Sequence, residues 1–218
     1  MGEVTILTPE QKSIFVKIAA NSFLTNNFYF SGGTALSEVY LKHRESLDLD
    51  FFADKRFDNQ MLFSFLLEWG KQLKFTIQPQ RAEDTFIYLL NFDGGKKLKL
   101  DFAYYPYKRL EPGTSYKKVT VDSLLDIAVN KLLLMNQRSE VKDYVDLYFL
   151  LDEYTVWDLI EGVKVKFRTE RDPLTLAADF LAVEEFEYLP KMLKPLTLNE
   201  LKKFFKKRAK KLAKDLVI

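Results

Sequence analysis

The chain has 218 residues, 47% of them hydrophobic, and a net charge of +2, which is enough material for one large or two small domains with a real core. The absence of cysteine excludes disulfides, iron–sulfur clusters and thiolate chemistry, and a single histidine excludes a multi-histidine zinc site. No 18-residue apolar segment and no early apolar run behind a basic stretch occur, so we expect a cytoplasmic protein without a membrane span or signal peptide.

The small net charge conceals an uneven distribution. Residues 191–218 contain 10 basic and 2 acidic residues, whereas residues 1–190 contain 23 basic and 29 acidic residues. A basic end on an acidic body is typical of a chain whose end meets a polyanion or an acidic surface. The alternative is an amphipathic helix whose charges are only solvated.

The first half of the sequence alternates helix and strand signals. Thr8 and Gln11 form a capping box around Pro9, which predicts a helix beginning there. A short aromatic strand over 28–31 stops at Gly32 and Gly33, and a helix over 34–41 follows. Further along we expect a helix over 58–73 and strands over 46–52, 74–79, 84–92 and 96–103, the last two joined by a turn at 93–95.

Strand signals nearly vanish beyond the segment 106–112, which is the best candidate for a boundary. Helices are expected over 122–137, 140–151, 156–166 and 173–188, and a second capping box at Thr197 and Glu200 begins a final helix. Its apolar side contains Leu201, Phe204, Phe205, Leu212 and Leu216. The order αβαβαβββ followed by helices predicts an α+β fold, with one domain over 1–112 and a helical region over 113–218 that ends in a basic helix.

Three aspartates are the first candidates for chemistry. Asp48 and Asp50 alternate with apolar residues and point to the same face of a strand, with Cα atoms roughly 6.5–7 Å apart. Two such carboxylates repel each other unless a cation is present, and they suit Mg²⁺, whose other ligands are water and substrate phosphates. Asp101, in another apolar strand, would complete a two-metal site. An Asp-x-Asp pair also occurs often by chance, so the context decides.

That context resembles a known family. The stretches 32–36 (GGTAL) and 43–52 (HRESLDLDFF) resemble the AbiEii/AbiGii-type nucleotidyltransferases of the DNA polymerase β-like superfamily. Lys131 to Arg138 and 142–147 (KDYVDL) resemble the helical motifs of that family, so the resemblance covers about residues 28–152. Between Gly33 and Asp48 lie 14 residues, which is slightly longer than the general superfamily spacing but matches this branch. The resemblance implies a mixed-sheet nucleotidyltransferase core with flanking helices.

The resemblance also implies roles for individual residues. Mg²⁺ (or Mn²⁺) would be held by Asp48, Asp50 and Asp101, and Asp101 would help to activate the acceptor hydroxyl. Lys131 would neutralise phosphate charge, and Asp143 would belong to the final active-site motif. The nucleotide would be contacted by Gly32, Gly33, Thr34, Arg44, Ser46 and Lys131.

Several of these side chains have a second interpretation. Arg44 would contact phosphate or pair with an acidic neighbour, and Ser46 would bind nucleotide or cap a turn. Lys97 and Lys99 would serve phosphates or be the solvated charges of an edge strand. His43 would have a structural or surface role or act as a general base. Asp146 lies on the same helix face as Asp143 and would share its role or only form a hydrogen bond within the helical pair. Asp122 and Asp126 are expected at the start of a helix. Where some relatives carry a nucleotide-contacting base, this chain has Glu38, with Lys42 one turn later.

The function implied by the resemblance is transfer of NMP from an NTP to an acceptor hydroxyl. The family further implies the toxin half of a toxin–antitoxin or abortive-infection system, with an antitoxin protein as partner. Transfer RNA 3′ ends, or another RNA, are one acceptor class, and the basic end is compatible with RNA. The alternatives are a protein or small-molecule acceptor such as an aminoglycoside, and a catalytically idle nucleotide-binding or partner-binding module.

Overall fold

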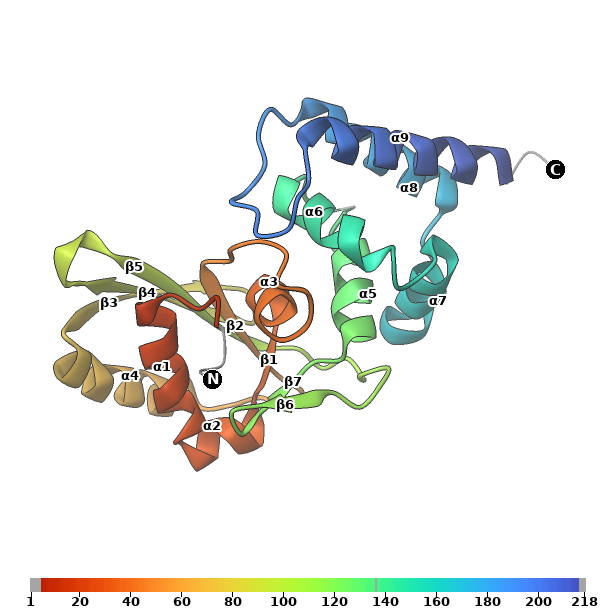
Figure 1. Cartoon of the computed structure of the whole chain (residues 1–218). Helices are drawn as coiled ribbons and strands as arrows, with labels where there is room; N and C mark the ends of the chain where they lie inside the picture. Colours follow the sequence, from red (N-terminus) through yellow and green to blue (C-terminus); the bar gives the residue numbers. More distant parts are fainter. Residues whose placement is uncertain (1–4, 136, 216–218) are drawn as a thin grey trace. The chain divides into compact units, whose positions relative to one another are not determined.

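A computed structural model describes residues 5–135 and 137–215 (Figure 1). The chain divides into two units that are each discontinuous in sequence. Unit 1 contains the residues up to Tyr40, together with Ser46–Lys108 and Pro112–Asp122. Unit 2 contains Leu41–Glu45, Arg109–Glu111 and the residues from Ser123 onward. The sequence predicted a single division near residue 112, whereas two short segments before residue 112 belong to unit 2.

Unit 1 is built on a mixed β-sheet. Among the described residues seven strands pair in the order β3-β4-β5-β2-β1-β7-β6. Their bounds are β1 Tyr29–Ser31, β2 Asp48–Ala53, β3 Phe75–Ala82, β4 Thr85–Phe92, β5 Lys97–Tyr104, β6 Thr114–Tyr116 and β7 Val119–Val121. The pairs β2–β5 and β1–β7 are parallel and the others are antiparallel. The mixed sheet confirms the predicted fold class, but β6 and β7 were missed.

Two of the helices of unit 1 begin at the N-caps that the sequence predicted. Thr8 and Gln11 form the predicted capping box of α1, Pro9–Ala19. The short helix α2, Ser22–Asn27, was not predicted, and α4, Asn59–Leu73, begins after its N-cap Asp58 as expected. The expected helix at 34–41 is α3, Gly32–Ala35, which begins two residues earlier and continues as a π-helical segment, Leu36–Leu41.

One face of the sheet is lined by phenylalanine rings. Phe30 of β1, Phe51 of β2 and Phe102 of β5 are stacked in sequence, with ring centroids 5.3 and 5.5 Å apart, and Phe15 of α1 meets Phe30 edge-on at 5.1 Å. All four side chains are at most 1% exposed. Because side chains alternate along a strand, this apolar core turns the intervening polar residues of β2 and β5 to the opposite face.

Unit 2 is helical. Its helices are α5 Leu124–Leu134, α6 Val141–Leu150, α7 Val156–Phe167, α8 Pro173–Leu181 and α9 Leu198–Asp215, with a 3₁₀ turn at Ala182–Glu185. All five were predicted, but α5 is shorter than the predicted 122–137, and the 173–188 segment is helical only through α8 and the turn that ends at Glu185. Asn136, inside the predicted helix 122–137, lies outside the described residues.

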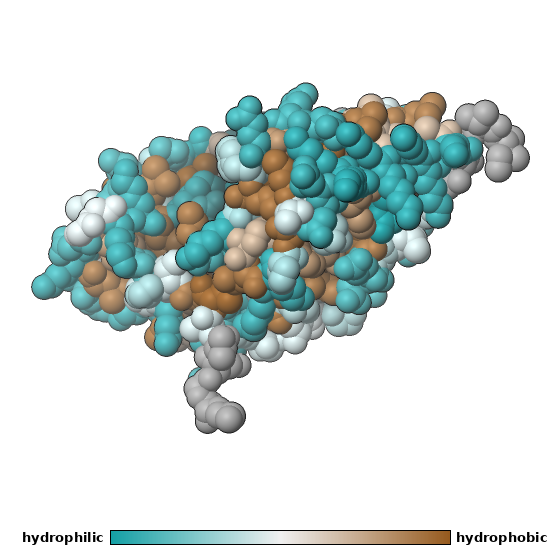
Figure 2. All heavy atoms as spheres, turned by 45° about the horizontal axis from the view of Figure 1, so that its top comes forward, coloured by the Kyte–Doolittle hydropathy of each residue, from teal (hydrophilic) through white to brown (hydrophobic). Residues whose placement is uncertain are grey.

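The last helix, α9, has two chemically distinct sides. Leu201, Phe205, Ala209 and Leu212 are at most 4% exposed and recur at helical spacing. Thr197 and Glu200 form the predicted capping box, in which the Thr197 amide donates to the Glu200 carboxylate over 2.7 Å. The lysines on the opposite side are exposed, and the part of α9 that faces the reader in Figure 2 is mostly hydrophilic. Leu216, expected on the apolar side, lies outside the described residues.

Candidate active site

The three candidate carboxylates lie on one face of two neighbouring strands. Strand β2 pairs with β5 in parallel, and the register sets Asp50 directly beside Asp101 and Asp48 beside Lys99. Neighbouring strands are about 4.8 Å apart, so these side chains are close neighbours on the face opposite the phenylalanine core. Asp101 is only 7% exposed, whereas Asp48 and Asp50 are half-buried. We call Asp48, Asp50, Lys99 and Asp101 the carboxylate face.

Lys99 is the cation of this face. Its ammonium donates a hydrogen bond to Oδ2 of Asp101. Burial alone would lower the pKa of Lys99, but the hydrogen bond to Asp101 and the charges of Asp101, Asp48 and Asp50 outweigh burial and raise it. The edge-strand interpretation of Lys97 and Lys99 was wrong, because β5 lies between β4 and β2 in the sheet.

Gly32 lies against the carboxylate of Asp50. Its φ is +74°, and a Cβ at this position would overlap Oδ2 of Asp50 and come within 2.8 Å of its Cγ. Glycine is therefore favoured here by the backbone conformation and by the space that Asp50 fills. Gly33 and Thr34 are the next residues of α3, and the Thr34 hydroxyl donates to the carbonyl of Asp48. This hydrogen bond connects α3 to the first residue of β2.

The other polar residues near the first motif have structural partners. The carbonyl of Ser46 accepts a hydrogen bond from Nε2 of Gln11 over 2.8 Å. Glu38 is 3% exposed and accepts from the amide of Ile6 over 2.8 Å and from the hydroxyl of Tyr116 over 2.5 Å. Glu38 therefore holds the N-terminal segment and β6 together in unit 1.

In unit 2, the residues of the predicted helical motifs form a buried ion-pair cluster. Asp146 of α6 accepts two hydrogen bonds from Arg44, with Nε at 2.6 Å and Nη2 at 2.8 Å, and one from Nε2 of His43 at 2.7 Å. Lys131 of α5 lies 2.6 Å from Asp146 and 2.7 Å from Asp143. Asp146 therefore has a partner within the helical pair, Lys131, as expected, and also binds His43 and Arg44. The expected structural role of His43 fits its complete burial.

The charges in this cluster are strongly coupled. Burial alone would raise the pKa of Asp146, but the cations of Lys131 and Arg44 hold it well below its usual range. Burial alone would lower the pKa of Lys131, and Asp146 and Asp143 raise it instead. Arg138 completes the cluster, with its Nε 2.9 Å from Asp143.

A second buried ion pair was not foreseen in the sequence. Asp126 lies 2.6 Å from Nζ of Lys166 on α7, and both side chains are fully buried. Asp126 also accepts hydrogen bonds from the amides of Leu110 and Glu111. The expectation that Asp126 only starts a helix was too simple, because it also anchors the segment 109–111 to α5. Asp122, expected alongside it, instead accepts a hydrogen bond from Ser31 in unit 1 over 2.9 Å.

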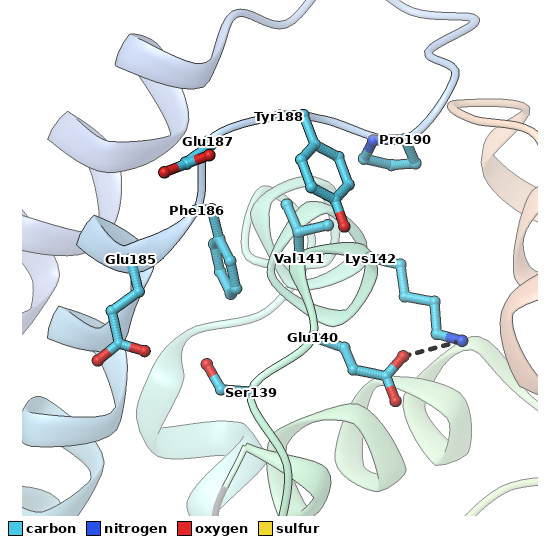
Figure 3. A pocket seen from close by; sticks show the side chains of 9 residues that line it. All are labelled: Ser139, Glu140, Val141, Lys142, Glu185, Phe186, Glu187, Tyr188 and Pro190. Carbon is cyan, nitrogen blue, oxygen red and sulfur yellow. Dashed lines mark ion pairs between the residues drawn. The ribbon is translucent and has the colours of Figure 1, made fainter.

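Unit 2 also contains a pocket of about 500 Å³ beside the start of α6 (Figure 3). Glu140 and Lys142 line it and form an ion pair of 2.9 Å. The other lining residues are Ser139, Val141, Glu185, Phe186, Glu187, Tyr188 and Pro190. None of the predicted site residues lines this pocket.

The described residues contain neither a preformed metal cage nor a membrane-spanning helix. Within residues 5–135 and 137–215, no group of three or more acidic, histidine or cysteine side chains forms a ready-made metal cage. Mg²⁺ does not need such a cage, because it is usually bound by one or two carboxylates together with water and substrate phosphates. In the same part of the chain, no helix is long and apolar enough to cross a membrane.

Residues 14–217 match the family described as "Nucleotidyl transferase AbiEii toxin, Type IV TA system". The chain belongs to the AbiEii nucleotidyl transferase toxin family. An uncharacterised protein of Aquifex aeolicus is 32% identical over 211 residues, which cover 94% of this chain and 96% of that protein.

Solved structures show the same fold. JHP933 from Helicobacter pylori has a TM-score of 0.59 and 21% identity, covering 94% of this chain and 89% of that one. Another H. pylori structure, described as a candidate nucleotidyltransferase, has a TM-score of 0.58 and 21% identity, covering 96% of this chain and 97% of that one. At this identity these likenesses concern the fold alone.

Membership of the AbiEii family confirms the resemblance that the first motif indicated. The chain is a nucleotidyltransferase of a toxin–antitoxin family, which implies an NTP substrate and an antitoxin partner.

Proposed function

We propose that the chain transfers NMP from an NTP to an acceptor hydroxyl with the help of Mg²⁺ or Mn²⁺ and releases pyrophosphate. The observation that supports this proposal best is the register of β2 and β5, which sets Asp50 beside Asp101 with Asp48 on the same face. With Lys99 included, the carboxylate face has a formal charge of −2, which one divalent cation would balance.

The residues fit such a metal. Asp48, Asp50 and Asp101 would be its ligands, because carboxylate oxygens are the donors that Mg²⁺ prefers. The metal, when bound, would neutralise phosphate charge and make the attacking hydroxyl more acidic. Asp101 would accept the proton of that hydroxyl, and Gly32 leaves room for the carboxylate of Asp50 because it has no side chain.

The roles proposed for unit 2 concern positioning. Lys131 and Asp143 form a buried ion pair in the cluster. We therefore propose that they act as a pair and that replacing either one would weaken nucleotide binding. Arg44 is bound to Asp146 by two hydrogen bonds, which favours the pairing interpretation over a phosphate contact. For Ser46, the hydrogen bond from Gln11 involves the backbone carbonyl, so the side chain keeps both proposed roles, nucleotide contact and turn cap.

We propose RNA, with tRNA 3′ ends as one candidate, as the acceptor. The support is α9, where Lys203, Lys207, Lys210 and Lys214 are exposed and recur at i, i+4, i+7 and i+11. This spacing gives one stripe about 16 Å long, opposite the buried apolar side of the helix. Among the described residues, no ion pair joins these four lysines to an acidic side chain. A row of exposed ammonium groups suits the phosphates of a nucleic acid.

The test is transfer of label from each of the four α-labelled NTPs to total RNA, lysate protein and small hydroxyl compounds. We expect label in RNA, and we expect Asp48→Asn or Asp50→Asn to lower transfer by at least about a hundredfold. Asp54→Asn is the matched control, because Asp54 is an exposed aspartate just after β2. Label only in protein or small molecules would replace the RNA proposal. No transfer by the wild type, with equal toxicity of the Asp48 and Asp50 variants in cells, would favour the idle binding module.

A further inference from the structure

Lys99 occupies an unusual position for a lysine. It lies on an interior strand, and its side chain is 37% exposed, whereas that of its partner Asp101 is 9% exposed. Its neighbour on β2 is Asp48, and the next pair on the same face is Asp50 of β2 beside Asp101 of β5. One ammonium group is therefore set among three carboxylates on one face of the sheet.

This arrangement reduces the repulsion between neighbouring carboxylates. Asp50 and Asp101 are adjacent on neighbouring strands, and like charges in such positions repel each other. The ammonium of Lys99 offsets this repulsion through its hydrogen bond to Asp101. A divalent cation held by the same carboxylates would offset it as well. The two cations repel each other, so they compete for Asp101.

We propose that Lys99 is a resident counter-cation that holds Asp101 in the absence of metal and gives up this contact when a divalent cation binds. The proposal rests on the metal dependence proposed above. The side chain of Lys99 is long enough and exposed enough to turn outward, and the phosphates of a bound NTP would then attract its ammonium. Lys99 is thus a positioning residue that makes metal binding unfavourable until nucleotide arrives with the metal.

The test is the binding of Mn²⁺ alone to the full chain, measured by electron paramagnetic resonance of free Mn²⁺. We expect Lys99→Met to bind Mn²⁺ about fivefold to tenfold more tightly than the wild type, because the competing charge is gone. We expect Lys99→Arg to stay within about twofold of the wild type because it keeps the charge. Lys97→Met is the matched control, since Lys97 is an exposed lysine two residues earlier on the same strand face.

The outcomes separate the two proposals. If the wild type binds Mn²⁺ and both Lys99→Met and Lys99→Gln bind it equally or more weakly, the counter-cation role of Lys99 is wrong and the metal dependence survives. If neither the wild type nor either variant binds Mn²⁺ alone, the counter-cation role of Lys99 is wrong. If none of them binds Mn²⁺ in the presence of a non-hydrolysable NTP either, the metal dependence fails as well. Urea denaturation identifies any variant that has not folded. If Lys99→Met has not folded, Lys99→Gln is compared with the wild type in its place. If Lys99→Met tightens binding in the wild-type background but has no such effect in the Asp101→Asn background, the proposal is supported, because the competition is for Asp101.

Discussion

Arg44 and Asp146 are 102 residues apart in the sequence, yet the guanidinium of Arg44 binds the carboxylate of Asp146 through two hydrogen bonds of 2.6 and 2.8 Å. Both side chains are almost completely buried. A buried carboxylate is tolerable only when its partners compensate for the lost water, and here Arg44, Lys131 and His43 do so together.

Removing one charge from this cluster should destabilise the protein strongly. Asp146→Asn leaves Arg44 and Lys131 buried without their main anion, so we expect a loss of about 3–5 kcal/mol in the free energy of unfolding. Urea denaturation measures it, and Glu161→Gln, an exposed acidic residue on α7, is the control. A loss below about 1 kcal/mol, the range of surface ion pairs, would show that the cluster contributes little.

The stability should depend on pH through His43. Burial lowers the pKa of His43 below 6.5, and the charges of Arg44 and Lys131 add to this effect against the opposing influence of Asp146. The unfolded chain therefore takes up a proton near pH 6.5 while the folded protein does not. The contribution of His43 to stability is complete above that pH and decreases as the pH falls toward its folded pKa.

The measurement is urea denaturation between pH 8 and pH 5. Because the chain has a single histidine, any decrease in this range that disappears in His43→Gln belongs to that residue. A decrease of equal size in the variant would assign the effect to carboxylates instead. Asp146 itself has a lowered pKa, so its contribution persists until more acidic pH, below its ordinary value of 3.8.

A methyl group at Gly32 should affect the carboxylate face more than one at Gly94. Both glycines have a φ of +74°, but a Cβ at Gly32 meets Asp50, whereas a Cβ at Gly94 has nothing within 4 Å. Backbone strain, about 1–2 kcal/mol, is therefore common to both alanine variants. We expect only Gly32→Ala to lower nucleotidyl transfer sharply, by at least about tenfold, because Asp50 must move. Equal activities in the two variants would remove the proposed link between Gly32 and the site.

The lysine stripe of α9 should contribute to RNA affinity in a salt-dependent way. Replacing Lys203, Lys207, Lys210 and Lys214 by glutamine should reduce the slope of log affinity against log salt by about three to four. Fluorescence anisotropy with labelled tRNA measures this slope. Four exposed lysines of unit 1, Lys12, Lys55, Lys71 and Lys74, provide a control of equal charge. Deleting 197–218 should also weaken binding, but it removes the buried Leu201 and Phe205 as well, so the glutamine set is the cleaner test. An unchanged slope would instead favour an acidic protein as the partner of the stripe.

Local patterns predicted most elements of this fold. The alternation of Asp48 to Phe52 and of Leu98 to Phe102 predicted β2 and β5, and the capping boxes located the starts of α1 and α9. By contrast, β6 and β7 are three residues each, and their turn uses Lys117 and Lys118 with φ of +48° and +72°. Such turns usually contain asparagine or glycine, so a pair of lysines gives no turn signal.

The candidate site was only partly predictable for a similar reason. Asp48, Asp50 and Asp101 were recognised from residue type and from their strand neighbours. The contact of Lys99 with Asp101 depends on β5 lying beside β2, and no local pattern determines that order when a helix and two strands intervene. Likewise, the partners of Asp146 come from residues 43, 44 and 131, which are distant in sequence and have no periodicity in common.

The assignment of residues 41–45 to unit 2 limits how this chain can be divided. A cut after Asp122 would leave His43 and Arg44 on the fragment that lacks Asp146, and Leu110 on the fragment that lacks Asp126. Hybrids built by exchanging everything after that point between two family members would therefore join ion-pair partners taken from different parents. Such exchanges should succeed only when residues 41–45 and 109–111 travel with the helices that bind them.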